Sequence, residues 1–564
     1  MHIELRRPFA IFMALALPAF AGAQSQPSER LNVQVAVNTA RVVGELPAVW
    51  RFFGADEPNY ATMKDGRKLL QALGELWPQQ VYFRAHNLLN TGDGTPAFKW
   101  GSTNAYTETS EGKPVYDWTI VDGIVDAYRD NGVRPYLQIG FMPQALSSAP
   151  PGTPYQHTWR PGFKYDLITT GWAYPPTSYE KWGELVYQWT LHNVERYGRA
   201  EVEQWYFEVW NEANFPTYWR GTPEEFYQLH DVSVAAIRRA LPTARVGGPD
   251  VAGPGGAFMD GFLAHVARGK NYSTGEIGTP TDFLSFHAKG RPTLVDGHVR
   301  MGIAAHLKDV AGGFAKIAAV PELARKPIVI GESDPEGCAA CPGPQNAYRN
   351  GTMYSSYTAA SFARIWQLAK EHKVNLEGVL SWSFTFESQP WFAGYRQLAT
   401  NGIDLPVLNV FRLFSKLGST QLDANSSSQV SLQEAMNQGV SGASDVGVLA
   451  TRAGNNLQVL LWNYHDDELA GTDATVSLNL SGMGRGDRAV TLWYVDPQRA
   501  NAFTAWKAMG SPQSPNEVQY QQLEQASRLL PTQSSPLLVK AGRASVNVDV
   551  PRQAVVLVEL APRK

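Results

Sequence analysis

Cysteine is nearly absent from this chain of 564 residues: only Cys338 and Cys341 occur, in the stretch "EGCAACPG". A C-x-x-C pair can be a redox pair, half of a zinc site or a local disulfide. The sequence offers no second ligand pair at metal spacing and no thioredoxin-like βαβ pattern around the two thiols. A disulfide that pins one loop is therefore the favoured interpretation, and it requires an oxidising compartment.

Charge of one sign is also lacking, because the formal net charge is only −3. This balance gives no electrostatic reason to expect nucleic acid or an anionic membrane as a partner. Charged residues make up 18% and hydrophobic residues 44% of the chain, which is typical of a folded protein and argues against wholesale disorder. A chain of this length is expected to form two or more domains.

Long apolar runs are missing except at the start, which reads "MHIELRRPFAIFMALALPAFAGAQSQ". Arg6 and Arg7 precede an apolar run over residues 8–20, and the small residues 21–23 follow it. This pattern predicts a secretory signal peptide over residues 1–23, too short to span a membrane. No cysteine follows the cleavage site, so a lipid anchor is not expected. We expect export to the periplasm or the extracellular space.

Aromatic residues, in contrast, are abundant, with 17 Trp and 23 Tyr. Indole and phenol rings suit stacking on sugars, because the apolar face packs on C–H groups while the polar tip forms hydrogen bonds. For most of these residues, filling a large core is the simpler explanation.

Eight short runs rich in β-branched and aromatic residues alternate with stretches of helical periodicity between residues 45 and 420. The runs are "AVWRFFGAD", "QVYFRAHN", "RPYLQIGFMP", "VEQWYFEVWNE", "ARVGGPD", "TDFLSFHAKG", "KPIVIGES" and "GVLSWSFTFE". One helical stretch opens at Thr222 with Pro223 at its first position, a good N-cap. This alternation predicts an α/β fold, a (β/α)₈ TIM barrel. The alternative, an open doubly wound sheet, lacks its glycine fingerprint, since Phe258 occupies the place of the third glycine.

The pattern changes after about residue 420. "ANSSSQVSL" reads as a polar linker, and six alternating strand patterns follow it, separated by Gly, Asn and Asp turns. We expect an accessory all-β sandwich domain over residues 421–564. The segment 24–44, which includes "LNVQVAVN", is expected to add a strand to that sandwich.

Polar side chains close the predicted barrel strands, where the active site of such a barrel lies. They are Arg84, His86, Asn211, Glu212, His287, Lys289, Glu332, Trp382 and Glu387. A metal site is not favoured, because the sequence has no H-E-x-x-H motif and no close pair of histidines. A Ser–His–Asp hydrolase would need G-x-S-x-G, which "GESDPEG" does not supply.

Two carboxylates on different strands, among aromatic and neutral polar groups, fit glycoside hydrolysis, which uses one proton donor and one nucleophile or base. Taken singly, each residue has an ordinary explanation. Glu332 could form a loop salt bridge, Arg84 could pair with Glu208, and His287 could be a barrel-rim histidine. The combination of residues carries the prediction.

The stretch "FEVWNEANFPTYW" resembles the W-N-E-P-N signature of clan A glycoside hydrolases, with Ala213 where proline is commoner. Further motifs occur in matching order, and with them the chain resembles glycoside hydrolase family 39, which includes β-xylosidases and α-L-iduronidases. These motifs are "YFRAHNLL", "GFMPQAL", "WGELVYQW", "RVGGPD", "DFLSFHAKG" and "IVIGESD". The resemblance covers most of residues 45–420.

The resemblance implies a retaining mechanism, with Glu212 as acid/base and Glu332 as nucleophile. It implies that Asn211 binds the sugar 2-hydroxyl. Arg84 near Glu332 would keep that carboxylate ionised, and Glu212 is expected to keep its proton beside Trp and Phe side chains.

Further positions that the resemblance assigns to the subsite for the non-reducing sugar are His86, His287, Trp382 and Glu387. Lys289 departs from the family, which often has Tyr there, so it could pair with Glu332 or grip a substrate group. No metal or other cofactor is implied.

The leading expectation is an exported, exo-acting β-xylosidase that releases xylose from xylo-oligosaccharides, with α-L-arabinosidase side activity. One alternative is another clan A glycosidase acting on an exopolysaccharide or a uronide. An iduronidase would want several cations around the substrate carboxylate, and only Arg84, Lys289 and Lys99 stand out. The alternative from another class is a carbohydrate-binding barrel without catalysis. A small oligosaccharide is the expected partner, and a monomer is the preferred oligomeric state.

Overall fold

The computed structural model describes residues 30–157, 169–382 and 384–563. The signal peptide expected over residues 1–23 lies outside the described residues. In the part of the chain that is described, no helix is long and apolar enough to cross a membrane.

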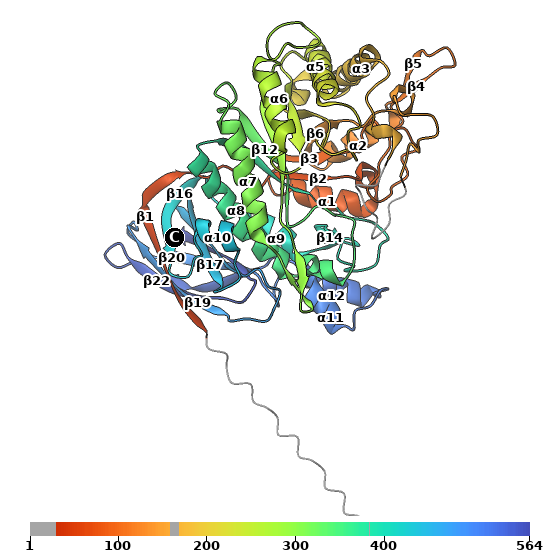
Figure 1. Ribbon diagram of the computed structural model, residues 1–564. Coiled ribbons are helices and arrows are strands. Elements are labelled where there is room, and N and C mark those ends of the chain that lie inside the picture. The colour runs from red at the N-terminus through yellow and green to blue at the C-terminus, as the bar shows by residue number, and fades with distance from the viewer. Residues whose placement is uncertain (1–29, 158–168, 383, 564) are drawn as a thin grey trace, which may run out of the picture.

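Eight parallel strands close into a barrel, which confirms the predicted fold class (Figure 1). They are β2 (Phe52–Ala55), β3 (Val81–Ala85), β6 (Val133–Ile139), β7 (Tyr206–Val209), β8 (Arg245–Val251), β9 (Phe283–Lys289), β12 (Pro327–Asp334) and β13 (Asn375–Trp382). Each predicted apolar run supplies one of these strands. The main helices that alternate with them are α1 (Lys64–Gly74), α2 (Thr119–Asp130), α3 (Tyr179–Tyr197), α5 (Pro223–Ala240), α6 (Gly256–Arg268), α7 (Ile303–Ala318), α8 (Thr352–His372) and α9 (Pro406–Phe414).

The helix expected after Thr222 begins as predicted. Thr222 accepts a hydrogen bond from the backbone N–H of Glu225, and the Glu225 side chain accepts one from the backbone N–H of Thr222. This reciprocal capping box satisfies two backbone donors that a helix start leaves open.

Aromatic rings fill the interior of the barrel. Phe52, Tyr82, Tyr136, Tyr206 and Phe283, each from a different strand, form one buried cluster with ring centroids 4.9 to 6.4 Å apart. Such ring pairs bury large apolar area and pack edge to face. Much of the aromatic content therefore serves the core, as the simpler explanation held.

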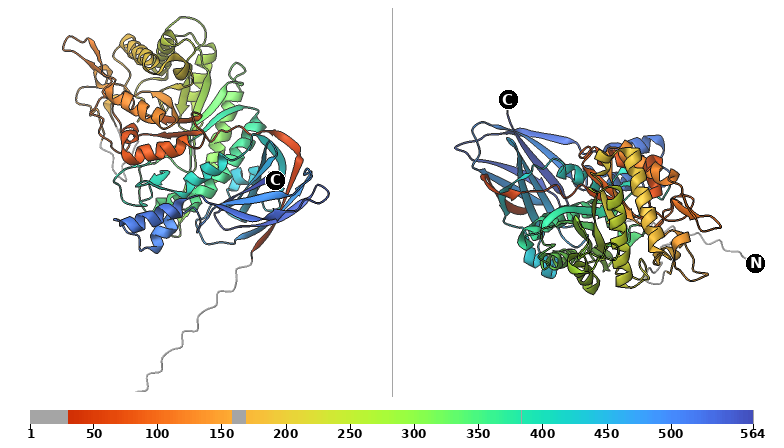
Figure 2. Two further views of the ribbon diagram at one scale, coloured as in Figure 1. Left: turned by 180° about the vertical axis from the view of Figure 1, so that it is seen from behind. Right: turned by 90° about the horizontal axis from the view of Figure 1, so that it is seen from above.

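A nine-stranded sheet forms the second, mostly-β part of the molecule, beside the barrel (Figures 1 and 2). Its strands in spatial order are β21 (Pro531–Leu537), β20 (Arg488–Val495), β23 (Val555–Pro562), β18 (Asn456–Tyr464), β17 (Asp445–Ala453), β16 (Thr420–Ser426), β1 (Leu31–Glu45), β19 (Ala474–Ser481) and β22 (Ala544–Val550). Strand β1 pairs antiparallel with β16 and parallel with β19. The sheet contacts the barrel through α8 and α9.

Three details of this region differ from the prediction. The stretch read as a polar linker begins inside β16, because Asn425 and Ser426 pair with β1 while their polar side chains stay partly exposed. Strand β21 is mostly exposed and lacks the alternating pattern that would reveal it. Helices α10 (Leu432–Gln438), α11 (Ala502–Ala508) and α12 (Glu517–Ser527) interrupt the strands, and their short patterns were missed.

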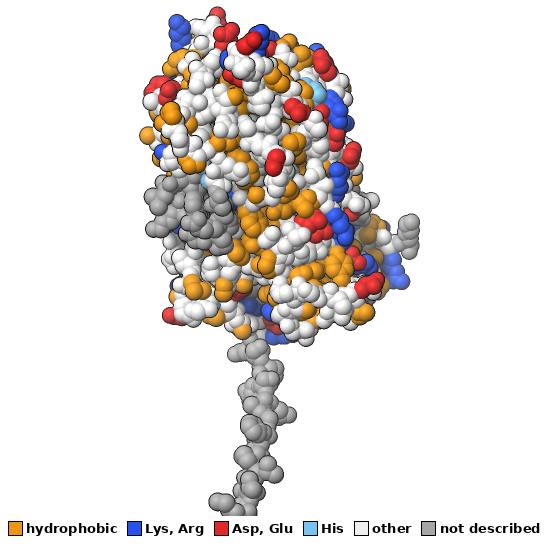
Figure 3. Space-filling model, turned by 90° about the vertical axis from the view of Figure 1, so that its right-hand side faces the viewer, with side chains coloured by type: hydrophobic (Ala, Val, Ile, Leu, Met, Phe, Trp, Pro, Cys, Tyr) orange, Lys and Arg blue, Asp and Glu red, His pale blue; other side chains and the backbone are white. Residues whose placement is uncertain are grey.

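The molecular surface mixes charges of both signs. On the face shown in Figure 3, acidic and basic side chains lie close to one another. This arrangement agrees with the small net charge.

Candidate active site

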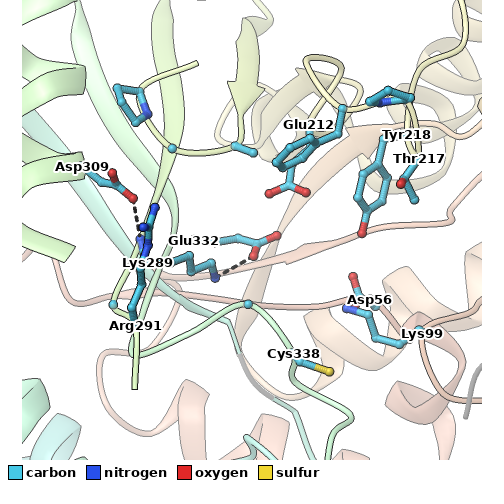
Figure 4. A pocket seen from close by; sticks show the side chains of 17 residues that line it. Asp56, Lys99, Glu212, Thr217, Tyr218, Lys289, Arg291, Asp309, Glu332 and Cys338 are labelled. Carbon is cyan, nitrogen blue, oxygen red and sulfur yellow. Dashed lines mark hydrogen bonds and ion pairs between the residues drawn. The ribbon is translucent and has the colours of Figure 1, made fainter. Parts of the chain in front are cut away.

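A pocket of about 740 Å³ opens at the C-terminal ends of the barrel strands. Loops after six strands line it, and its polar side chains include Asp56, Lys99, Glu212, Lys289, Arg291, Asp309 and Glu332 (Figure 4). The two glutamates predicted to do the chemistry both face this pocket. Among the described residues, no three His, Cys, Asp or Glu side chains are grouped so as to hold a metal ion.

Glu212 reaches the pocket through a sharp turn that follows β7. Trp210 and Glu212 have φ angles of 70° and 45°, in the left-handed region that non-glycine residues rarely adopt. Each such residue costs about 1–3 kcal/mol, so the surrounding structure must hold it. The backbone N–H of Glu212 donates to the carbonyl of Asp250 at 2.9 Å, which ties the turn to the neighbouring strand β8.

Glu332 lies in β12, with only 6% of its surface exposed. Its Oε2 atom is 2.7 Å from Nζ of Lys289, and its Oε1 atom is 3.7 Å from Nδ1 of His287. Burial alone would raise the pKa of Glu332. The positive charges of His287 and Lys289, together with that of Arg84, outweigh burial and hold that pKa well below its usual range. Glu332 is thus an ionised carboxylate, as a nucleophile must be.

The pairing register of β9 and β12 brings these groups together. Glu332 lies opposite His287, and Asp334 lies opposite Lys289. Because side chains alternate along a strand, both pairs face the same side. The Lys289 ammonium group therefore contacts two carboxylates, Glu332 and Asp334, each at 2.7 Å.

His287 connects the two catalytic candidates. Its Nδ1 atom lies 2.8 Å from Oε1 of Glu212 and 3.7 Å from Oε1 of Glu332. Two oxygens at these distances from one nitrogen cannot be farther apart than about 6.5 Å, the lower limit of the separation in inverting enzymes. The geometry therefore fits a retaining pair, whose carboxyl groups are about 5–5.5 Å apart.

Below the pocket, Arg84 joins four buried side chains. Its guanidinium donates to Glu208 Oε2 at 2.5 Å, contacts Asp250, and lies 2.7 Å from His86 Nε2 and 3.1 Å from Asn211 Oδ1. Arg84 helps to lower the pKa of Glu332, as expected, but His287 and Lys289 contribute more. The direct ion pairs of Arg84 are with Glu208 and Asp250, and Lys289 is the residue that pairs with Glu332. The alternative that Arg84 pairs with Glu208 is confirmed.

Asn211 is fixed for binding by that arginine. Its carbonyl oxygen accepts from Arg84, while its Nδ2 donor is buried and has no hydrogen-bond partner among the residues that the structure describes. Asn211 is fully buried and does not line the pocket, so its contact with a sugar hydroxyl stays a prediction.

His86 lies at the inner end of the site. Burial, together with the charge of Arg84, lowers its pKa to about 3, so the ring is neutral. Arg84 donates to Nε2, which leaves Nδ1 to donate to Asp56 Oδ1 at 2.8 Å. The Asp56 carboxylate also pairs with Lys99.

Of the nine predicted site residues, Glu212, Lys289 and Glu332 line the pocket, and the other six lie behind or beside it. Trp382 is 1% exposed, and its ring packs at a tilt of 40° against that of His86 with the centroids 4.4 Å apart, so it supports the floor of the site. Glu387 does not face the predicted sugar subsite. Its carboxylate accepts a hydrogen bond from the backbone N–H of Asp65 in the first turn of α1. Its negative charge there stabilises the start of that helix.

Sequence reasoning missed three acidic residues of the site: Asp56, Asp250 and Asp334. Each follows a predicted strand run at its very end, in "FFGAD", "RVGGPD" and "GESD". The same reading of strand ends that selected Glu332 could have selected them.

An ionised carboxylate and a second carboxylate placed on one histidine, at the mouth of an α/β barrel, define a retaining glycoside hydrolase. The aromatic side chains of Phe215 and Tyr218 in the pocket lining suit a sugar ring. Within that class, the chain belongs to the glycosyl hydrolases of family 39, whose family model matches residues 33–541.

The relatives agree with this assignment. The chain is 25% identical over 543 residues to a β-xylosidase of Caldicellulosiruptor saccharolyticus, a match that covers 94% of this chain and 99% of that protein. It is also 25% identical over 413 residues to an α-L-iduronidase of Mus musculus, with 68% and 62% covered. The solved structure of the family 39 enzyme from Xanthomonas axonopodis pv. citri has a TM-score of 0.72 at 23% identity, with 97% of this chain and 100% of that chain covered.

Proposed function

We propose that the protein is an exo-acting β-xylosidase that releases xylose from xylo-oligosaccharides, with α-L-arabinosidase side activity. The observation that supports this choice is that both lysines of the site form ion pairs with carboxylates of the chain. Lys289 contacts Glu332 and Asp334, and Lys99 pairs with Asp56. Their charges are balanced by the chain itself, which favours a neutral sugar over a uronic acid. The similarity to a β-xylosidase along nearly the whole chain supports the same choice.

The proposed reaction is a double displacement. Glu332 attacks the anomeric carbon while Glu212 gives a proton to the leaving oxygen. Attack turns Glu332 into a neutral ester, which removes one negative charge beside His287. Glu212, now a carboxylate, then takes a proton from water, and that water opens the ester.

A panel of aryl glycosides tests the substrate. We expect the β-D-xyloside to be turned over fastest, the α-L-arabinoside more slowly, and the α-L-iduronide least. Xylo-oligosaccharides should lose one xylose at a time from the non-reducing end. Faster turnover of the iduronide, or release of internal fragments, would contradict the proposal.

A uronide-cleaving glycosidase is the second candidate. Lys99, Lys289 and Arg291 line one pocket, and a relative is an α-L-iduronidase. This function would require Lys289 to leave Asp334 for the substrate carboxylate. The iduronide in the same panel distinguishes the two candidates.

We also propose that the protein is exported. The pattern of residues 1–23 and a disulfide between Cys338 and Cys341 both fit an oxidising compartment. N-terminal sequencing of the protein from the producing cells should find a start near Gln24 in the exported fraction. Full-length protein that stays in the cytoplasm would overturn this proposal.

A further inference from the structure

Asp250 is a fully buried carboxylate behind the active site. It belongs to β8, has 0% of its surface exposed and does not line the pocket. Its Oδ2 atom lies 2.7 Å from Nε2 of His287 and also contacts the guanidinium of Arg84. It does not line the pocket, so any role it has in the reaction must act through His287 or through Arg84.

The contact with Asp250 determines which ring nitrogen of His287 carries a hydrogen. A carboxylate can only accept, so the hydrogen must be on Nε2 of His287. The other nitrogen, Nδ1, is then turned toward Oε1 of Glu212 at 2.8 Å. At that distance, one of the two atoms donates a proton to the other. The Glu212–His287 pair therefore holds a single shared proton at the mouth of the pocket.

The charges around His287 leave Asp250 as its main counter-ion. Glu332, from β12, is 3.7 Å from Nδ1 but already pairs with Lys289. From β3, Arg84 also pairs with Glu208, and His86 is neutral. Together, Asp250 and Glu332 outweigh burial and raise the pKa of His287 to about 10.

We propose that Asp250 is a positioning residue that anchors His287 through Nε2–H and so keeps the proton for the leaving group in the Glu212–His287 hydrogen bond. When the glycosidic C–O bond breaks and the bond to Glu332 forms, that proton moves to the leaving oxygen. When water attacks the glycosyl-enzyme, its proton returns to the same pair. Asp250 itself stays a carboxylate throughout.

The test is the pH profile of kcat/KM for Asp250→Asn, a substitution that keeps the shape and removes the charge. Without that charge, the Glu212–His287 pair binds its proton more weakly. The alkaline limb of the profile should therefore move to lower pH by about one unit or more, since an adjacent charge shifts a pKa by roughly 1–3 units. The limb belongs to the pair and not to either residue.

The leaving group supplies a second readout that a merely structural role would not produce. Turnover of an alkyl or sugar leaving group, which needs a proton, should fall at least tenfold more than turnover of a dinitrophenyl glycoside. Glu208→Gln is the matched control, because it also removes a carboxylate from Arg84 but does not touch His287. An alkaline limb that stays in place in Asp250→Asn, or moves equally in both variants, overturns the inference.

If Asp250→Asn does not fold, the inference can still be tested on the wild-type enzyme. In protein labelled with ¹⁵N-histidine, with His287→Gln to assign the signal, Nε2 of His287 should remain protonated from pH 5 to pH 9. Loss of that proton within this range overturns the inference.

The inference rests on Glu212 as acid/base. A wild-type enzyme inactive on every glycoside would refute the proposed function, whereas an active enzyme with an unmoved limb would refute only the role of Asp250.

Discussion

At the scale of single residues, the two glutamates differ in their partners more than in their chemistry. Glu332 is nearly surrounded by cations and contacts Lys289 directly. Among the described residues, the charged side chain in contact with Glu212 is His287, and 17% of the Glu212 side chain is exposed. A carboxylate held among cations stays ionised, whereas one that shares a proton with a histidine can give that proton away and take it back.

This difference predicts opposite outcomes for the two alanine variants. Glu332→Ala should lose activity on all glycosides, because the nucleophile is gone. Glu212→Ala should lose about 10²–10⁴-fold on substrates with poor leaving groups, the usual contribution of general acid catalysis, but should still attack a dinitrophenyl xyloside. Azide should then accelerate Glu212→Ala and give the β-glycosyl azide, while Glu332→Ala should give the α-azide. Swapped anomers in the NMR spectra of the products would reverse the assignment.

Lys289 yields a prediction about pH. The cation lowers the pKa of Glu332, and the nucleophile must be ionised, so activity is lost as the pH falls through that pKa. Removing the Lys289 cation raises the pKa of Glu332. In Lys289→Ala, the acid limb of kcat/KM should therefore move to higher pH, by about one unit, and the ranking of xyloside, arabinoside and uronide should change as well.

Arg291→Ala is the control for this experiment, since Arg291 lines the same pocket but is not among the charges that lower the pKa of Glu332. Its acid limb should stay in place. An unmoved limb in Lys289→Ala would mean that His287 and Arg84 suffice to keep Glu332 ionised.

At the scale of elements, the loop after β12 depends on more than its disulfide. Cys338 and Cys341 are bonded, but the buried Arg349 also donates to the carbonyls of both cysteines at 3.0 and 2.9 Å and pairs with Glu336. This loop contributes Gly337 and Cys338 to the pocket wall. A charged side chain from the 3₁₀ helix 344–350 therefore ties the wall to the barrel.

We expect Arg349→Met to destabilise the protein more than removal of the disulfide. Removing one partner of a buried ion pair costs about 3–5 kcal/mol. A disulfide that closes so short a loop contributes about 2 kcal/mol or less in the chain-entropy account. Urea unfolding of Arg349→Met and of the double variant Cys338→Ser, Cys341→Ser measures both. A larger loss in the double variant would show that the disulfide is the main constraint.

At the scale of the whole molecule, the sheet and the barrel share a buried polar interface. Arg364, from α8, donates to Asp445 of β17 at 2.8 Å, and both side chains are at least 98% buried. Tyr357, from the same helix, packs edge-on against Tyr464 of β18 at 5.9 Å. Its hydroxyl group bonds His306, which in turn contacts Ser333 beside the nucleophile. The sheet therefore supports the barrel close to its reactive end.

We expect barrel and sheet to unfold in a single transition, with Arg364→Ala destabilising both by about 3–5 kcal/mol. Calorimetry of the two variants Arg364→Ala and Arg268→Ala checks this. Arg268 pairs with Glu322 on the surface, and loss of such an exposed pair should cost at most about 1 kcal/mol. Two separate transitions in Arg364→Ala would show that the parts fold independently.

The sequence by itself determined the barrel and the two glutamates. Period-two apolar runs alternating with helical periods leave few other folds, and residues that end such strands must meet at one rim. Asn211 and Glu212 could therefore be found from one strand, and Glu332 from another. The capping box at Thr222 is likewise local, since every contact it needs lies within four residues.

Only the tertiary structure decided which charges meet. The contacts of Lys289 with Glu332 and Asp334, and of His287 with Glu212 and Asp250, join residues 37 to 75 positions apart in the chain. They depend on the register of neighbouring strands, and a shift by one residue would turn these side chains to the opposite face. The sequence could show that the groups lie at one rim. Which carboxylate pairs with Arg84, and which nitrogen faces Glu212, follows from the closure of the barrel.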